Sequence, residues 1–316
     1  MRNVTKRRVR FVFLVAVTVA IVVTAFSLTR SDPRQGASAA STPPPNTIAP
    51  VTFSSYFLAI GASSSLGFEP TGIPHHRSRR TLEGYADDVV TLEGYKGVAL
   101  TLTQIGCPGE TVQTILNTKV ADHCYTLPVT QLTRTFTFFK AHQGGPGLVS
   151  IDLGFNDVRP CLSPTTIDEA CVAAGIAAVK VDMPRLLTVL KNAAGPHVKF
   201  VGLEYYDPFL THYFDGANGP AVANQTLVAI NQLNAVLAQA YSAAGVAVAD
   251  VPTYFQMNVT TRVTVANVGV IPVNVEQTCN LTWMCQPAPY GPDDHPSDEG
   301  YLQIANAMTP VIPASW

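Results

Sequence analysis

Residues 148–157, LVSIDLGFND, decide how this chain can fold, because an apolar run ends there in a glycine followed by polar residues. Short apolar runs bounded by turn residues are typical of buried strands. Four similar runs lie at 56–60, 98–103, 198–203 and 246–251, and helical patterns lie at 85–92, 111–117, 129–142, 176–193, 224–243 and 298–308. Apolar strands that alternate with helices predict a mainly parallel sheet covered on both faces. We therefore expect a single α/β domain with three layers, α/β/α, and a long irregular loop at 252–297, where no periodicity is visible.

The composition excludes several classes of protein. Of the 316 residues, 47% are hydrophobic and 13% are charged, which rules out intrinsic disorder for most of the chain. Only one apolar run is long enough to span a bilayer, so a polytopic membrane protein is excluded. Residues 35–316 carry 13 Lys or Arg against 21 Asp or Glu. That negative balance argues against binding to nucleic-acid phosphates.

The N-terminus has the pattern of an export signal. Four basic residues at 6–10 precede an uncharged, mostly apolar run at 11–28. We expect residues 1–30 to be a cleaved signal peptide or an uncleaved signal anchor, and both place the protein outside the cytoplasmic membrane. Residues 31–52 are rich in Pro, Ser, Ala and Thr and are expected to form a disordered linker. The globular domain is then 53–316, and only the N-terminal segment would contact the membrane.

The cysteines agree with export. An even number of cysteines in an exported chain indicates disulfides, and the six fall into three local pairs. The pairs are Cys107 with Cys124, Cys161 with Cys171, and Cys279 with Cys285. Fifteen connectivities are possible, and we expect this nearest-neighbour pairing. Since no Cys-x-x-Cys or clustered Cys/His spacing is present, we expect no metal site.

Polar segments follow the predicted strands. Residues 61–67 (GASSSLG) follow the first strand, 106–111 (GCPGET) the second and 154–157 (GFND) the third, while 292–301 (PDDHPSDEGY) lead into the last helix. The carboxyl ends of parallel strands meet at one edge of a sheet, where functional sites form. We therefore expect these segments to lie together.

These segments resemble the motifs of the SGNH hydrolase superfamily, the GDSL-like lipases and esterases, in its extracellular bacterial form. The resemblance covers residues 54–310 and is most specific at 154–157 and at His295-Pro296. It implies an SGNH hydrolase (flavodoxin-like) fold and a serine esterase. The sequence departs from the family pattern at Ala62 and Pro292, where the family has Asp.

The resemblance implies a nucleophile and a base. Ser63 takes the place of the nucleophilic serine, with Ser64 and Ser65 as rivals. A serine hydroxyl needs a base to take its proton, and a histidine that titrates near neutrality suits this role. His295 is the histidine in the family context. We expect the histidines at 123, 142, 197 and 212 to be surface or capping residues.

A third group should orient the imidazole. Asp293 is the first candidate, since the family's acid is missing at Pro292; a backbone carbonyl is the alternative. Asp294 should point elsewhere. For the oxyanion, the resemblance implies the Ser63 N–H, the Gly109 N–H and the Asn156 side-chain amide.

Alternatives remain open for several of these residues. Gly106 is the rival of Gly109 for the oxyanion donor, and Asn156 would otherwise be a simple turn residue. Asp157 is expected to hold its loop. The aromatic residues Tyr205, Tyr206 and Phe209 either line the substrate cleft or belong to the core.

The sequence thus favours an exported serine esterase or lipase that forms an acyl-enzyme on Ser63, with His295 as general base and no cofactor. Its substrate would be a small-molecule or lipid ester, or an acylated glycan. Ala62 and Pro292 motivate one alternative, a catalytically impaired binding protein on the same scaffold. An acyltransferase, which uses the same acyl-enzyme, is the other.

Overall fold

A computed structural model describes residues 55–71, 79–120 and 124–313 of the chain. Residue contacts divide the chain into Met1–Ala49 and Pro50–Trp316, and every described residue belongs to the second unit. The predicted signal segment at 1–30 and linker at 31–52 lie outside the described residues. Among the helices of the described part, none is both long and apolar enough to cross a bilayer.

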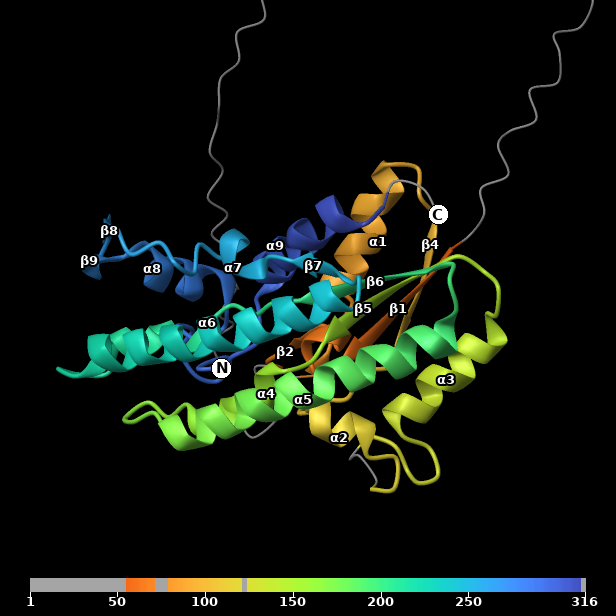
Figure 1. Cartoon of the computed structure of the whole chain (residues 1–316). Coiled ribbons are helices and arrows are strands. Elements are labelled where there is room, and N and C mark those ends of the chain that lie inside the picture. Colours follow the sequence, from red (N-terminus) through yellow and green to blue (C-terminus); the bar gives the residue numbers. More distant parts are fainter. Residues whose placement is uncertain (1–54, 72–78, 121–123, 314–316) are drawn as a thin grey trace, which may run out of the picture. The chain divides into compact units, whose positions relative to one another are not determined.

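Within the described residues, five parallel strands form the central sheet (Figure 1). They are β1 (Ser55–Gly61), β4 (Leu100–Gln104), β5 (Gly147–Asp152), β6 (Val198–Leu203) and β7 (Ala247–Ala249). Their spatial order is β4-β1-β5-β6-β7, and all four neighbouring pairs are parallel. This is the flavodoxin-like order, in which the chain changes direction across the sheet at β1 and β5. The predicted fold class is confirmed.

Helices cover both faces of the sheet (Figure 1). Along β1, Leu58 and Ile60 pack toward α2, α3, α5 and α6, while Phe57 and Ala59 pack toward α1, α7 and α9. The helices are α1 (Tyr85–Tyr95), α2 (Val112–Leu116), α3 (Gln131–Ala141), α4 (Phe155–Val158), α5 (Glu169–Ala194), α6 (Gly219–Ala243), α7 (Val251–Tyr254), α8 (Val273–Leu281) and α9 (Asp298–Met308). Because both faces are buried, every residue of β1 is buried, which explains its continuous apolar run.

The prediction of a long irregular loop at 252–297 was wrong. The structure has an antiparallel hairpin there, β8 (Arg262–Val265) and β9 (Gly269–Pro272), followed by α8. The hairpin is largely exposed and short, so it lacks the apolar run by which a buried strand is recognised. The segments 255–261 and 282–297 are without a helix or strand.

The three disulfides have the expected pairing. Cys107–Cys124 holds the loop that follows β4. Cys279–Cys285 joins the end of α8 to the segment 282–297.

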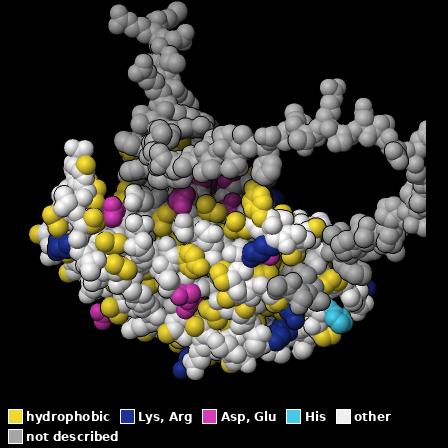
Figure 2. All heavy atoms as spheres, turned by 90° about the horizontal axis from the view of Figure 1, so that it is seen from above, with side chains coloured by type: hydrophobic (Ala, Val, Ile, Leu, Met, Phe, Trp, Pro, Cys, Tyr) yellow, Lys and Arg dark blue, Asp and Glu magenta, His cyan; other side chains and the backbone are white. Residues whose placement is uncertain are grey.

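Charged side chains are scattered over the surface. Figure 2 shows one face of the molecule, on which the described Lys and Arg side chains lie in small separate groups among acidic and apolar ones. This face therefore offers no continuous basic surface among its described residues, as the sequence composition also indicates.

Candidate active site

A cavity of about 1140 Å³ opens at the carboxyl end of the sheet, where β1 and β5 diverge to their loops. Among its lining residues are Ser63, Gly109, Asn156, Asp293 and His295. These residues come from four segments that are far apart in the sequence. The structure therefore brings together all five residues that the sequence motifs selected.

The turn that carries Ser63 is fixed from several sides. Gly61 has φ +142°, and a Cβ there would overlap the backbone of Asp152 on the neighbouring strand. The Ala62 N–H donates to the Asp152 backbone oxygen at 2.9 Å. The Ser65 hydroxyl donates to the Ala62 carbonyl at 2.6 Å, so Ser65 is buried and already engaged. Ser63 lies inside this fixed turn and faces the cavity.

Asp152, the last residue of β5, is a site residue that the motifs did not select. Its Oδ2 accepts the Ser65 N–H at 3.0 Å, and its Oδ1 accepts the Tyr205 hydroxyl at 2.8 Å. Burial raises the pKa of Asp152 to about 6, against these hydrogen bonds and the attraction of His295. Position 62 is an alanine, and the turn is held by a carboxylate from the adjacent strand. The signal in the sequence was an acidic residue inside an apolar run.

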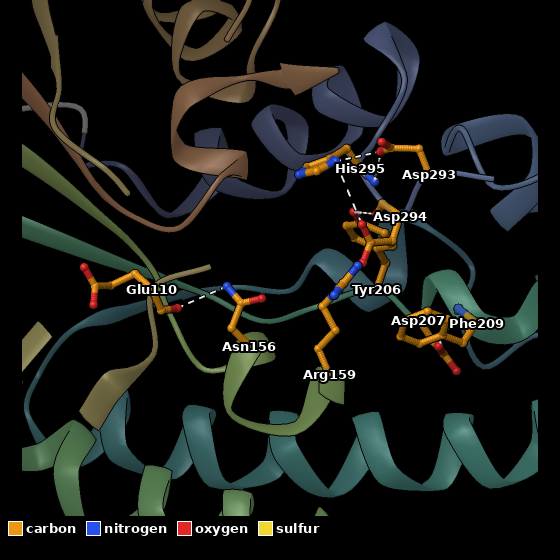
Figure 3. A network of polar contacts seen from close by, with 9 residues as sticks. All are labelled: Glu110, Asn156, Arg159, Tyr206, Asp207, Phe209, Asp293, Asp294 and His295. Atoms are coloured by element: carbon orange, nitrogen blue, oxygen red, sulfur yellow. Dashed lines mark hydrogen bonds and ion pairs between the residues drawn. The ribbon is translucent and has the colours of Figure 1, made fainter. Parts of the chain in front are cut away.

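Two backbone groups and one amide could bind an oxyanion. Within the described residues, the N–H groups of Ser63 and Gly109 donate no hydrogen bond. The Asn156 Nδ2 donates to the carbonyl of Glu110 at 3.1 Å (Figure 3), which holds the amide beside the residue that follows Gly109. Gly106 is not among the residues that line the cavity. It packs against the Ser65 hydroxyl, which a Cβ at position 106 would overlap. The geometry therefore favours Gly109.

Asp157 connects two of the motifs. Its Oδ2 accepts the Val112 N–H at 3.0 Å, which ties α4 to the first turn of α2. It is not among the residues that line the cavity, in agreement with its expected structural role.

His295 is oriented by the residue two positions before it (Figure 3). Its Nδ1 lies 2.6 Å from Asp293 Oδ1, and its backbone N–H donates to the same oxygen at 3.0 Å. A carboxylate accepts only, so Nδ1 carries the proton in this contact and Nε2 is the basic nitrogen. This tautomer is the one that a general base requires.

Asp294 is held away from this role. Its Oδ1 lies 3.9 Å from His295 Nδ1, and its Oδ2 forms an ion pair with Arg159, directly after α4 (Figure 3). The Tyr206 hydroxyl donates to the Asp294 carbonyl at 2.8 Å. Asp293 is therefore the closer partner of the imidazole.

The structure brings Ser63 and His295 to one cavity without bonding them. Among the residues that the structure describes, no hydrogen bond joins the Ser63 hydroxyl to His295. Catalytic hydrogen bonds often tighten only when the substrate is bound.

One wall of the cavity is aromatic. Phe155 stacks on Tyr205 and on Phe209, with ring centroids 5.5 and 6.1 Å apart. Tyr205, Tyr206 and Phe209 are buried and also line the cavity, so both interpretations of these residues hold.

The prediction that His212 is a surface or capping residue was wrong. It is 6% exposed, stacks on Phe209 and lines the cavity, with its Nδ1 2.8 Å from Asp215 Oδ2. The Phe209 ring and the Asp215 carboxylate accommodate it in the core, and neither contact was visible in the sequence.

Comparisons with known proteins give similar solved structures. No protein-family model matches the sequence, and no curated protein matches it. A protein described as a GDSL-like lipase from Parabacteroides merdae is 14% identical, with a TM-score of 0.48, over 81% of this chain and 94% of that one. An extracellular lipase from Streptomyces rimosus is 21% identical, with a TM-score of 0.48, over 81% and 100%. A phospholipase A1 from Streptomyces albidoflavus is 19% identical, with a TM-score of 0.47, over 80% and 99%.

Proposed function

We propose that this protein is a serine esterase of the SGNH type, which hydrolyses carboxylic esters through an acyl-enzyme on Ser63. One observation carries the proposal. A serine from the first strand end, an amide from α4 and a histidine from the C-terminal loop line the same cavity. A nucleophile, an oxyanion donor and a base with its own orienting carboxylate are the groups that acyl transfer requires.

In the proposed mechanism, His295 Nε2 takes the proton of Ser63 while the Ser63 oxygen attacks the ester carbonyl carbon. The negative charge that develops on the carbonyl oxygen is stabilised by the N–H groups of Ser63 and Gly109 and by the Asn156 amide. Asp293 holds the imidazolium through Nδ1. The intermediate then expels the alcohol, which receives the proton from His295, and water hydrolyses the acyl-enzyme by the same steps.

The buried carboxylate of Asp152 supports the same mechanism. It is ionised above pH about 6 and attracts the positive charge of His295. A buried negative charge near the imidazole stabilises the imidazolium that forms during the reaction. Asp152 is therefore proposed as a positioning residue, which also holds the turn of Ser63 through the Ser65 N–H.

The walls of the cavity support a proposal for the substrate class. The aromatic wall at Phe155, Tyr205 and Phe209 suits an apolar acyl group. The cavity, at about 1140 Å³, has room for more than an acetyl group. We propose esters with an apolar acyl chain, in small molecules or lipids. We further propose that the protein works outside the cytoplasmic membrane, where its three disulfides are stable.

The test is hydrolysis of p-nitrophenyl esters of increasing chain length by the wild type, Ser63→Ala and Ser64→Ala. Ser64 is the matched control, because it is the next residue and also lines the cavity. We expect Ser63→Ala to lose at least ~10⁴-fold in kcat/KM and Ser64→Ala to stay within a few-fold. Equal rates in the wild type and Ser63→Ala would overturn the assignment of Ser63, and rates no higher than the uncatalysed background in both would leave the binding-protein alternative.

An added alcohol distinguishes hydrolysis from acyl transfer. Under the proposal, the acid remains the main product when glycerol or a sugar is present. A transferred acyl group as the main product would instead identify an acyltransferase.

A further inference from the structure

Three carboxylates lie together outside the active-site cavity. Glu69 is the last residue of β2 (Phe68–Glu69), Glu83 precedes α1, and Asp298 is the first residue of α9. One oxygen from each of the three lies within 4.8 Å of the other two. Like charges this close repel each other strongly unless something neutralises them.

Glu69 points to a missing ligand. It is only 8% exposed, and its Oε1 is buried without a hydrogen-bond partner in the described part of the chain. The indole N–H of Trp283 lies close to Glu69 but does not reach hydrogen-bond geometry, and it is also buried without a partner. A buried carboxylate oxygen with no donor is costly, so this oxygen is expected to bind a positive charge.

The described protein does not supply that charge. Among the ion pairs of the described residues, none includes Glu69, Glu83 or Asp298. Arg80, which is near them in the sequence, donates to the Gln104 side chain instead. Glu69 and Glu83 line a separate cavity of about 550 Å³ together with Arg79 and Arg80, and this cavity gives an ion access from solvent.

We propose that Glu69, Glu83 and Asp298 form a calcium-binding site. Calcium prefers carboxylate oxygens and binds them at about 2.3–2.6 Å, so two oxygens on one ion lie up to ~4.8 Å apart. The oxygens of the cluster meet this limit. Magnesium demands strict octahedral geometry and usually keeps several of its waters, so three convergent carboxylates suit calcium better.

The ion would join two segments that lie close to His295, namely β2 and the start of α9. Glu69 follows Phe68, whose ring lies 6.0 Å from the His295 ring and lines the active-site cavity. The Tyr301 hydroxyl of α9 already donates to the Phe68 carbonyl at 2.7 Å, and Asp298 lies three residues after His295. Calcium would thus fix β2 to the start of α9. This role does not depend on the chemistry proposed for Ser63.

The first experiment measures Tm with and without calcium chloride up to ~10 mM, since extracellular calcium modules bind at about 10⁻⁴–10⁻³ M. We expect calcium to raise the Tm of the wild type by about 5 °C at a ~100-fold excess over Kd. Asp298→Asn and Glu83→Gln, both at exposed positions, should lose most of this rise. Glu299→Gln, the matched control beside Asp298 in the first turn of α9, should keep it.

The second experiment uses terbium, which substitutes for calcium, with Trp283 as the sensitiser. We expect saturable sensitised luminescence that calcium displaces, that Asp298→Asn weakens and that Trp283→Phe dims without abolishing binding. No calcium-dependent rise in Tm, or the same rise in the wild type and the cluster variants, would overturn the proposal. A Glu69→Gln variant that is stabilised and unresponsive to calcium would show that the carboxylates share a proton instead.

Discussion

The two sides of the active-site cavity are held in different ways. On the nucleophile side, Ser63, Gly109 and Asn156 lie in the segments that follow β1, β4 and β5, and the parallel pairing of these strands puts the segments at one edge of the sheet. On the histidine side, His295 belongs to the segment 282–297, which has no helix or strand.

The nucleophile side is fixed by buried hydrogen bonds to the sheet. The buried Gln131 side chain both accepts the Gly61 N–H at 2.7 Å and donates to the Gly61 carbonyl at 3.0 Å. Asp152 holds Ser65 and Ala62. These bonds leave the turn of Ser63 little freedom.

The histidine side is fixed by contacts between loops. The backbone N–H of Trp283 donates to the His295 carbonyl at 3.1 Å, and the Cys279–Cys285 disulfide joins this segment to α8. The ion pair of Arg159 with Asp294 reaches it from the opposite side of the cavity. We infer that substitutions on the nucleophile side change the rate at a fixed geometry, whereas those on the histidine side change the geometry itself.

The largest expected effect on the nucleophile side, apart from loss of Ser63, is that of Asn156→Ala. Removing one oxyanion donor lowers kcat by about 10²–10³-fold. KM and Tm should change little, because the turn of Ser63 does not depend on this amide. The control is Asn231→Ala on α6, away from the cavity. A large fall in Tm that accompanies the fall in kcat would show that Asn156 is a structural turn residue.

On the histidine side, Asp293→Asn should lower kcat by about 10²-fold. The effect is below the ~10⁴-fold loss known for a buried triad carboxylate, because this pair is partly exposed and Asp294 lies near the ring. An amide at 293 can stabilise the wrong tautomer, so the pH dependence of kcat should change as well. Asp294→Asn is the control, with a much smaller effect. Unchanged kinetics in Asp293→Asn would mean that a backbone carbonyl orients His295.

The buried carboxylate of Asp152 makes stability depend on pH. Its pKa rises from 3.8 to about 6 on folding, mainly by burial. As pH increases from about 4 to 7, the unfolded chain loses this proton before the folded one, which lowers the free energy of unfolding by about 3 kcal/mol. Asp152→Asn lacks this loss. The free energy of unfolding, measured with denaturant between about pH 4 and 7, should therefore fall in the wild type relative to Asp152→Asn as pH rises. The same pH dependence in both proteins would contradict the assignment.

The smallest effect is expected for Arg159→Met, which removes the ion pair with Asp294 and keeps a side chain of similar length. A half-exposed ion pair contributes up to about 1 kcal/mol, so kcat should fall by no more than about 5-fold. The released Asp294 then competes with Asp293 for the imidazole. In the double variant with Asp294→Asn, part of the lost activity should return. Failure of this rescue would remove the role assigned to Arg159.

The same contrast explains what the sequence could predict. The apolar runs indicate the five strands, and a parallel sheet brings their carboxyl ends together, so Ser63, Gly109 and Asn156 could be selected from the sequence alone. Asp152 was missed because its role depends on the strand beside it. The burial of His212 was missed because its partners Phe209 and Asp215 are local, and nothing in this short segment indicates that it packs against the cavity. The Glu69, Glu83 and Asp298 cluster was missed because it joins segments that are far apart in the sequence.

The most direct test of the central claim is labelling with a fluorophosphonate, which reacts with serines activated by a base, followed by mass spectrometry of the peptides. We predict a single adduct on Ser63 in the wild type and its loss in His295→Ala, with the fold of the variant confirmed by circular dichroism. An adduct on Ser64, or labelling of Ser63 that persists without His295, would contradict the pairing of these two residues across the cavity.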